Sequence, residues 1–340
     1  MIPAPFFIVG CPRSGTTLLQ ILLDAHPHIA IPPESFVVQR FAPLLPLYGN
    51  LADPVRQLRF LSDLLADERI RDWELTGVTP NDILRRAERP TASALIAALF
   101  SLYAERHGKR RWGDKTPHHA LCLPDLLALF PEARIIHLVR DGRDVAESTC
   151  RIPIGPSSLL GAARRWKHFV RTVRAAIPHI PPRQFLEVRF ETMVQNPDAV
   201  RRDLLHFLGE SEAVASPLGD RLPETETRAR SASIAHHASL KTAITTAKIG
   251  VFRQSFSPRQ IELFEAIAGD CLSELGYARE FPNPRPPTRR EIAAAFLQDH
   301  TARYVRKWFQ PHPVAQISKE IRLALQPHLR KWRLRWSAVT

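Results

Sequence analysis

The 340-residue sequence is poor in cysteine and has no long hydrophobic run. Its four cysteines are widely separated and form no Cys-x-x-Cys pair, which argues against a zinc site or a disulfide framework and fits a reducing compartment. No apolar stretch reaches the length needed to span a membrane. The first residues lack the basic start and the cleavage site of a signal peptide. We therefore expect a globular protein of the cytoplasm.

Positive charge is concentrated at the end of the chain. Residues 281–340 contain twelve Lys and Arg against three Asp and Glu, a net charge of +9, which leaves +4 of the total +13 for the first 280 residues. A proline-rich stretch at residues 281–287 separates the two parts. We predict one domain at residues 1–280 and a basic helical extension at residues 281–340.

Strand-like and helix-like segments alternate along the first part. A short apolar run at residues 6–9 precedes a helical pattern at residues 16–25, and further strands are predicted at residues 134–140 and 185–190. This order predicts an α/β fold of the P-loop type, with three layers and a central parallel sheet flanked by helices. A helical insertion is expected at about residues 36–111, either as a cover over the substrate or as a packing layer.

The loop after the first predicted strand has the glycine spacing of a Walker A motif. Thr17 occupies its hydroxyl position, but Thr16 stands where nucleoside triphosphatases have a lysine. Backbone amides at a helix N-terminus still bind an anion, and Arg13 adds a forked cation suited to phosphate or sulfate oxygens. The loop therefore predicts binding of a 5′-phosphate rather than magnesium-dependent ATP hydrolysis. A glycine-rich turn without a ligand is the alternative.

A second anion site is predicted at the end of the strand at residues 134–140. Arg140 ends this strand, and Ser148 follows eight residues later in the next helix. The carboxyl ends of parallel strands lie on one edge of a sheet, where ligands bind, so both residues are expected to face an anion there. For Arg140 alone, a surface salt bridge is the alternative.

These two segments resemble a known family. Residues 12–18 are similar to the 5′-phosphosulfate loop of sulfotransferases that use 3′-phosphoadenosine-5′-phosphosulfate (PAPS), and residues 134–148 resemble their 3′-phosphate-binding strand, turn and helix. Weaker matches lie at residues 112–118, 186–197 and 249–253. The resemblance covers about residues 5–277. It implies a sulfotransferase that moves a sulfuryl group from PAPS to an acceptor hydroxyl by in-line displacement.

The resemblance also implies roles for individual residues. Residues that would bind the donor are Pro12, Arg13, Ser14, Gly15, Thr16, Thr17, Arg140, Ser148 and Arg253. Glu34 matches the catalytic glutamate of tyrosylprotein sulfotransferases and would deprotonate the acceptor, with His26, His118 and His119 as rival bases. Lys115 matches the family's catalytic lysine and would stabilise the leaving oxygen, while Arg13 would serve both the phosphosulfate and Glu34. Ser239, or alternatively Thr242, would match a catalytic serine of the family. No metal ion is required if cationic side chains neutralise the charge.

The acceptor is left open by the sequence, because apolar helices in the insertion suit a lipid, a glycan, a phenol or a peptide tyrosine equally well. The basic segments at residues 304–309 and 329–336 predict either a packed appendage or contact with an anionic membrane surface or acceptor. No recognition module accompanies this charge, so nucleic acid is not expected as a partner. Two alternative functions are a P-loop kinase or triphosphatase, and a nucleotide-binding, membrane-peripheral scaffold without turnover.

Overall fold

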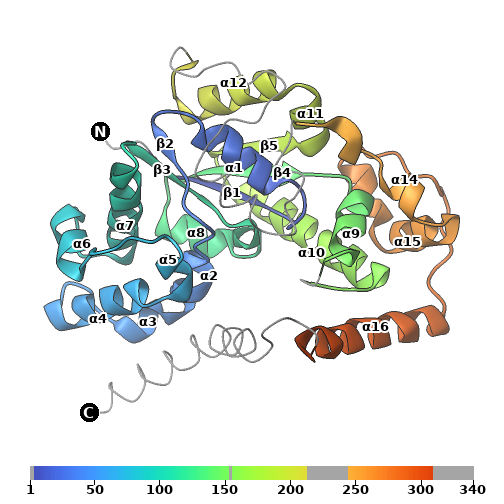
Figure 1. The fold of residues 1–340 in the computed structure, drawn as a ribbon, viewed down its shortest axis with the longest axis horizontal. Helices are drawn as coiled ribbons and strands as arrows, with labels where there is room; N and C mark the ends of the chain where they lie inside the picture. The colour runs from blue at the N-terminus through green and yellow to red at the C-terminus, as the bar shows by residue number, and fades with distance from the viewer. Residues whose placement is uncertain (1–3, 153–154, 213–243, 309–340) are drawn as a thin grey trace.

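The computed structural model describes residues 4–152, 155–212 and 244–308. Within them, five parallel strands form one sheet in the order β2-β3-β1-β4-β5 (Figure 1). The strands are β1 Phe6–Gly10, β2 Ile29–Ala30, β3 Arg111–Lys115, β4 Arg134–Val139 and β5 Phe185–Arg189. The predicted α/β fold with a central parallel sheet is confirmed. The chain crosses over after β1, so that β1 lies between β3 and β4, with the loop after it at the centre of the sheet.

Alternate side chains of β1 pack against different helices, which gives the fold its three layers. Phe6 and Ile8 share a core with α1 (Thr16–Asp24), α11 (Phe190–Gln195) and α12 (Pro197–Leu208). Phe7 and Val9 point to the other face, toward α7 (Ala92–Arg106), α8 (Leu123–Leu129) and α10 (Leu159–Ala176) (Figure 1). Because β1 is buried on both faces, its sequence is an apolar run without alternating polar residues, as predicted for a buried parallel strand.

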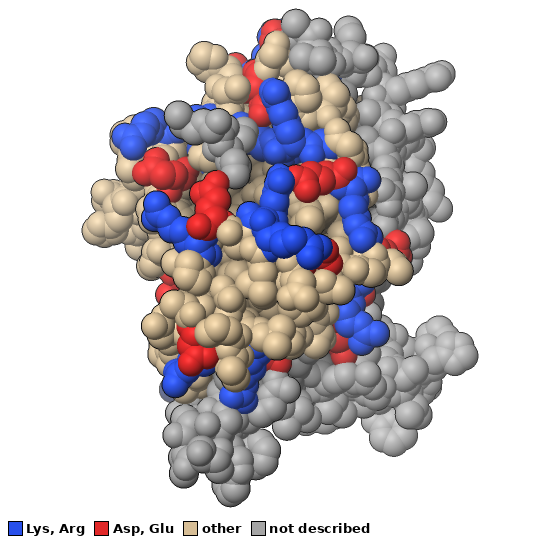
Figure 2. Space-filling model, turned by 90° about the vertical axis from the view of Figure 1, so that its left-hand side faces the viewer, with Lys and Arg blue, Asp and Glu red and all other residues tan. Residues whose placement is uncertain are grey.

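The predicted helical insertion lies between β2 and β3. Its helices are α2 Val37–Phe41, α3 Leu45–Tyr48, α4 Pro54–Leu65, α5 Glu68–Arg71, α6 Pro80–Arg86 and α7. Asp53 caps α4, and Thr79 forms a capping box with Asp82 at the start of α6. On the face that the insertion contributes to, basic and acidic side chains intermingle (Figure 2). That face therefore offers no large patch of one charge sign.

Helices after β4 pack on one another and on α10. They include α9 (Gly142–Cys150), α14 (Phe252–Ser255), α15 (Pro258–Glu274) and α16 (Arg289–Trp308). Helix α16 docks at the start of α10, where Asp299 accepts hydrogen bonds of 2.7 Å from the backbone amides of Ser157 and Ser158. The basic segment at residues 329–336 lies outside the described residues. None of the helices in the described ranges is both long and apolar enough to cross a lipid bilayer.

Candidate active site

The loop between β1 and α1 has a constrained backbone. Arg13 and Gly15 have φ angles of 77° and 101°, in the left-handed region. A Cβ atom at Gly15 would lie 2.5 Å from Phe190 Cδ2, so only glycine fits. The hydroxyl of Ser14 is buried and has no hydrogen-bond partner among the described residues. An unsatisfied donor beside a helix N-terminus fits an anionic ligand.

Three of the polar residues predicted to bind the donor, Arg13, Arg140 and Ser148, come together at this loop. Arg13 Nε donates to Ser148 Oγ at 3.1 Å, and Arg140 Nη1 donates to the Arg13 carbonyl at 3.1 Å. Burial, and then the neighbouring Arg140, lower the pKa of Arg13. Arg140 Nε is buried without a hydrogen-bond partner in the described part of the chain. Two close guanidinium groups that repel each other favour an anion between or beside them.

The segment before α14 closes over this region and is tied to α9. Arg140 Nη2 donates to the Lys248 carbonyl at 2.6 Å, and Asp144 accepts hydrogen bonds from the amides of Gly250 at 2.7 Å and Phe252 at 3.0 Å. Arg253 lies within α14, where its side chain is exposed and pairs with Glu280 at 2.8 Å. Its predicted contact with the donor stays a prediction. Ser239 and Thr242 lie outside the described residues.

Glu34 and Lys115, predicted as base and cation, form an ion pair. Lys115 Nζ lies 2.6 Å from Glu34 Oε1 and 3.5 Å from Thr17 Oγ1, so the pair borders the loop. The Lys115 side chain is 5% exposed and that of Glu34 is 31% exposed. Desolvation opposes ionisation of Glu34, but Lys115 more than offsets it, and the pKa of Glu34 falls below its ordinary value. Glu34 is thus an accessible, ionised carboxylate beside the anion site.

Hydrogen bonds from distant parts of the chain hold the backbone around Glu34, and no sequence motif connects their donors to it. Gln20 of α1 donates to the carbonyls of Ile31 and Pro32, at 3.1 and 3.2 Å. Trp73 Nε1 donates to the Pro33 carbonyl at 2.9 Å. Each of these contacts fixes the chain on one side of Glu34 and limits where its carboxylate can lie.

On the other side of Glu34, Ser35 is tied to β3. Ser35 Oγ donates to Asp114 at 2.6 Å, and the Ser35 amide donates to Thr116 Oγ1 at 3.0 Å. Because Asp114 immediately precedes Lys115, one buried carboxylate fixes the backbones of both members of the ion pair. The only sequence signal for Asp114 is its place in the weaker family match at residues 112–118.

The rival bases differ from Glu34 in position, since His118 Nε2 lies 3.2 Å from Arg165 Nη2 and His119 is fully buried. Burial and the nearby Arg165 lower the pKa of His118 to about 4, and burial lowers that of His119 to about 3. His26 Nε2 lies 3.1 Å from the Ser211 carbonyl, within a cluster with His28 and Glu210 whose ligand atoms lie within 4.8 Å of one another. The carboxylate of this cluster is already paired with two cations, Arg110 and Arg111. The geometry therefore favours Glu34 as the base.

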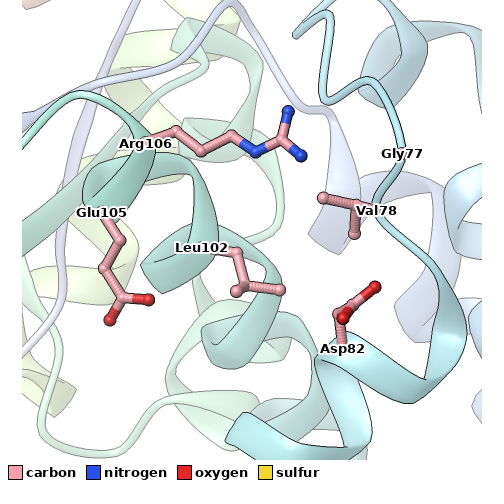
Figure 3. A pocket seen from close by; sticks show the side chains of 6 residues that line it. All are labelled: Gly77, Val78, Asp82, Leu102, Glu105 and Arg106. Carbon is pink, nitrogen blue, oxygen red and sulfur yellow. The ribbon is translucent and has the colours of Figure 1, made fainter.

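A separate pocket of about 330 Å³ lies in the helical insertion. It is lined by Gly77, Val78, Asp82, Leu102, Glu105 and Arg106 (Figure 3). Asp82 caps α6, and Arg106 donates to the Thr76 carbonyl at 2.6 Å, so both have structural roles. The pocket contains none of the residues predicted to act in the site.

The chain matches an established class of enzymes. A model of the sulfotransferase family matches residues 5–213, which is more than half of the chain. The chain therefore belongs to the sulfotransferase family and is an enzyme of that family. This confirms the class that the sequence predicted.

The chain is similar to several named proteins. The nodulation protein NoeE of Sinorhizobium fredii is 27% identical over 307 residues, covering 84% of this chain and 68% of that protein. Human protein-tyrosine sulfotransferase 1 is 29% identical over 209 residues, which is 59% of this chain and 50% of that protein. The sulfotransferase domain from the curacin biosynthetic pathway has the same fold, with a TM-score of 0.56 and 19% identity over 81% of this chain and 98% of that domain.

Proposed function

We propose that this enzyme transfers the sulfuryl group of PAPS to an acceptor hydroxyl by in-line displacement. The observation that carries the proposal is the 2.6 Å ion pair between Lys115 and Glu34, next to a phosphate loop that lacks the Walker lysine. A base and a cation side by side suit a reaction in which one oxygen loses a proton and another gains negative charge.

In this proposal the donor is bound at both ends. Residues 12–17 hold the 5′-phosphosulfate at the N-terminus of α1, with Arg13 gripping its oxygens. Arg140 and Ser148 hold the 3′-phosphate, and Arg253 adds a contact from the closing segment. The Ser14 hydroxyl and Arg140 Nε have no hydrogen-bond partner among the described residues, and they support these assignments because both are donors that an anion would satisfy.

The transfer step needs no metal ion in this scheme. Glu34 accepts the proton of the acceptor hydroxyl as its oxygen forms the new bond to sulfur. The bond between sulfur and the 5′-phosphate oxygen breaks, and that oxygen leaves with the electron pair. Lys115 and Arg13 stabilise the charge that develops there.

Two measurements test the proposal. Calorimetry should show tighter binding of adenosine 3′,5′-bisphosphate (PAP) than of ATP with magnesium; the reverse order would favour a kinase or triphosphatase. Incubation of the purified protein with sulfur-labelled PAPS and an extract of its own cells should yield a labelled product. PAP binding without any labelled product would favour a nucleotide-binding scaffold.

A further inference from the structure

Four side chains form a continuous surface beside Glu34, which we call the acceptor patch: Arg69, Phe36, His118 and Arg165. Arg69 Cζ lies 4.9 Å from the centre of the Phe36 ring, and the Phe36 and His118 rings are 5.3 Å apart. His118 Nε2 lies 3.2 Å from Arg165 Nη2. The patch joins α5, the start of α2, the segment after β3 and α10, and all four residues are partly exposed.

The acceptor patch has an excess of positive charge. Neither Arg69 nor Arg165 forms an ion pair with a carboxylate among the described residues. The adjacent Glu34 is already paired with Lys115. His118 is neutral at pH 7, because burial and Arg165 hold its pKa near 4. Arg69 thus acts electrostatically on Glu34, Arg165 contacts the adjacent His118, and neither arginine has an acidic partner among the described residues.

The conformation of Phe36 indicates that this arrangement is imposed by the fold. Its φ of 53° is in the left-handed region, which is costly for a bulky side chain. The Phe36 amide lies 3.4 Å from Thr116 Oγ1, the same hydroxyl that accepts from the Ser35 amide. The Thr116 hydroxyl, which helps to hold the backbone next to Glu34, therefore also helps to hold Phe36, on whose ring Arg69 stacks. Strained residues of this kind are concentrated at ligand sites.

We propose that the acceptor patch binds an anionic group, so that the acceptor carries a carboxylate, sulfate or phosphate close to the hydroxyl that is sulfated. Stacked or hydrogen-bonded arginines lose little conformational freedom when they grip an oxyanion. A neutral acceptor would leave both guanidinium groups without a counter-charge when it covered them. The inference rests on the proposed function, because it places the acceptor next to Glu34.

The first test separates acceptors by charge. An extract of the enzyme's own cells is divided on an anion exchanger into bound and unbound fractions, and each is incubated with the enzyme and labelled PAPS. Label in the bound fraction is expected, and label confined to the unbound fraction would overturn the inference. If neither fraction is labelled although PAP binds, the transferase function itself fails, and this inference fails with it.

The second test uses the labelled acceptor fraction with variants of the patch. Arg69→Gln and Arg165→Gln should each raise KM for the acceptor by roughly tenfold, because each removes a charge-assisted hydrogen bond, while PAP affinity stays unchanged. Arg71→Gln and Arg164→Gln are the matched controls, since these arginines are exposed on the same two helices. Arg69→Lys should recover part of the loss if charge is what matters. Equal KM values in the patch variants and the controls would overturn the inference.

Discussion

Arg13 Nε donates a hydrogen bond to Ser148 Oγ across 3.1 Å, although the two residues are 135 positions apart. Arg13 follows β1 and Ser148 lies in α9 after β4, and these two strands are neighbours in the sheet. The residues proposed to bind opposite ends of the donor thus belong to one hydrogen-bond network. A substitution at one end of this network should therefore also change binding at the other end of the donor.

Ser148→Ala tests this network. The variant loses a group proposed to bind the 3′-phosphate and leaves Arg13 Nε without its partner, so PAP affinity should fall by roughly tenfold. The affinity for AMP, which has no 3′-phosphate, should fall less. Calorimetry with both nucleotides measures the difference, and Ser62→Ala on the exposed side of α4 is the control. An equal loss for PAP and AMP would contradict the assignment of Ser148.

Glu34→Gln separates chemistry from binding. The amide keeps the shape of the side chain but cannot accept the acceptor proton, so kcat should fall roughly 10²- to 10⁴-fold. The dissociation constant of PAP should change little, because Glu34 is not proposed to touch the nucleotide. Single-turnover transfer from labelled PAPS gives the rate, with the exposed Glu88→Gln as control. Retention of full activity in Glu34→Gln would assign the base to another residue.

The pH dependence of transfer gives an independent check on the base. Lys115 holds the pKa of Glu34 below its ordinary value of 4.5, so Glu34 stays ionised down to that pH. The fall in kcat/KM caused by protonation of Glu34 should therefore lie below pH 4.5. Above pH 5 the protonation of Glu34 should no longer change kcat/KM. Burial raises the pKa of Asp114 to about 6, so the profile is measured in both wild type and Asp114→Asn. A limb near pH 6 or 7 that persists in the variant would contradict Glu34 as the base.

The sequence predicts the apolar strands of the fold well and β3 poorly. Hydrophobic runs predict β1 and β4 to within a residue or so, because such runs mark buried parallel strands, and alternation predicts β5 equally closely. In β3, Arg111 and Asp114 are charged yet fully buried. Arg111 is neutralised by Glu210 at 3.2 Å, and Asp114 is satisfied by Ser35. Such partners, far away in sequence, are invisible until the chain is folded.

The site likewise contains residues that sequence motifs predict and residues that no motif predicts. Five site residues belong to recognisable motifs: Arg13, Glu34, Lys115, Arg140 and Ser148. The structure brings them into two hydrogen-bonded groups, one of Arg13, Arg140 and Ser148 and one of Glu34 and Lys115. The residues that hold Glu34 in place, Gln20 and Trp73, have no motif. The contact of Trp73 depends on where the helical insertion packs, and those of Gln20 depend on the path of the chain after α1; a single sequence specifies neither. The placement of Arg253 beside Glu280 is of the same kind.

The buried Asp114 predicts how stability varies with pH. Burial raises its pKa from 3.8 to about 6, only partly offset by hydrogen bonds from Ser35 and Thr116. Between these two pH values the folded protein binds a proton that the unfolded chain does not, so this group makes the wild type less stable as pH rises. The full effect is about 3 kcal/mol above pH 6.

Asparagine mimics the protonated carboxyl and does not titrate, so Asp114→Asn should gain stability relative to wild type as pH rises from 4 to 7. Urea unfolding at several pH values measures this difference, and Asp125→Asn, on the exposed side of α8, should show no such trend. A constant difference between wild type and Asp114→Asn across this range would mean that Asp114 titrates near its ordinary pKa. The hydrogen bonds from Ser35 and Thr116 would then be strong enough to stabilise a buried carboxylate, and the support they give to Glu34 and Lys115 would be stronger than proposed.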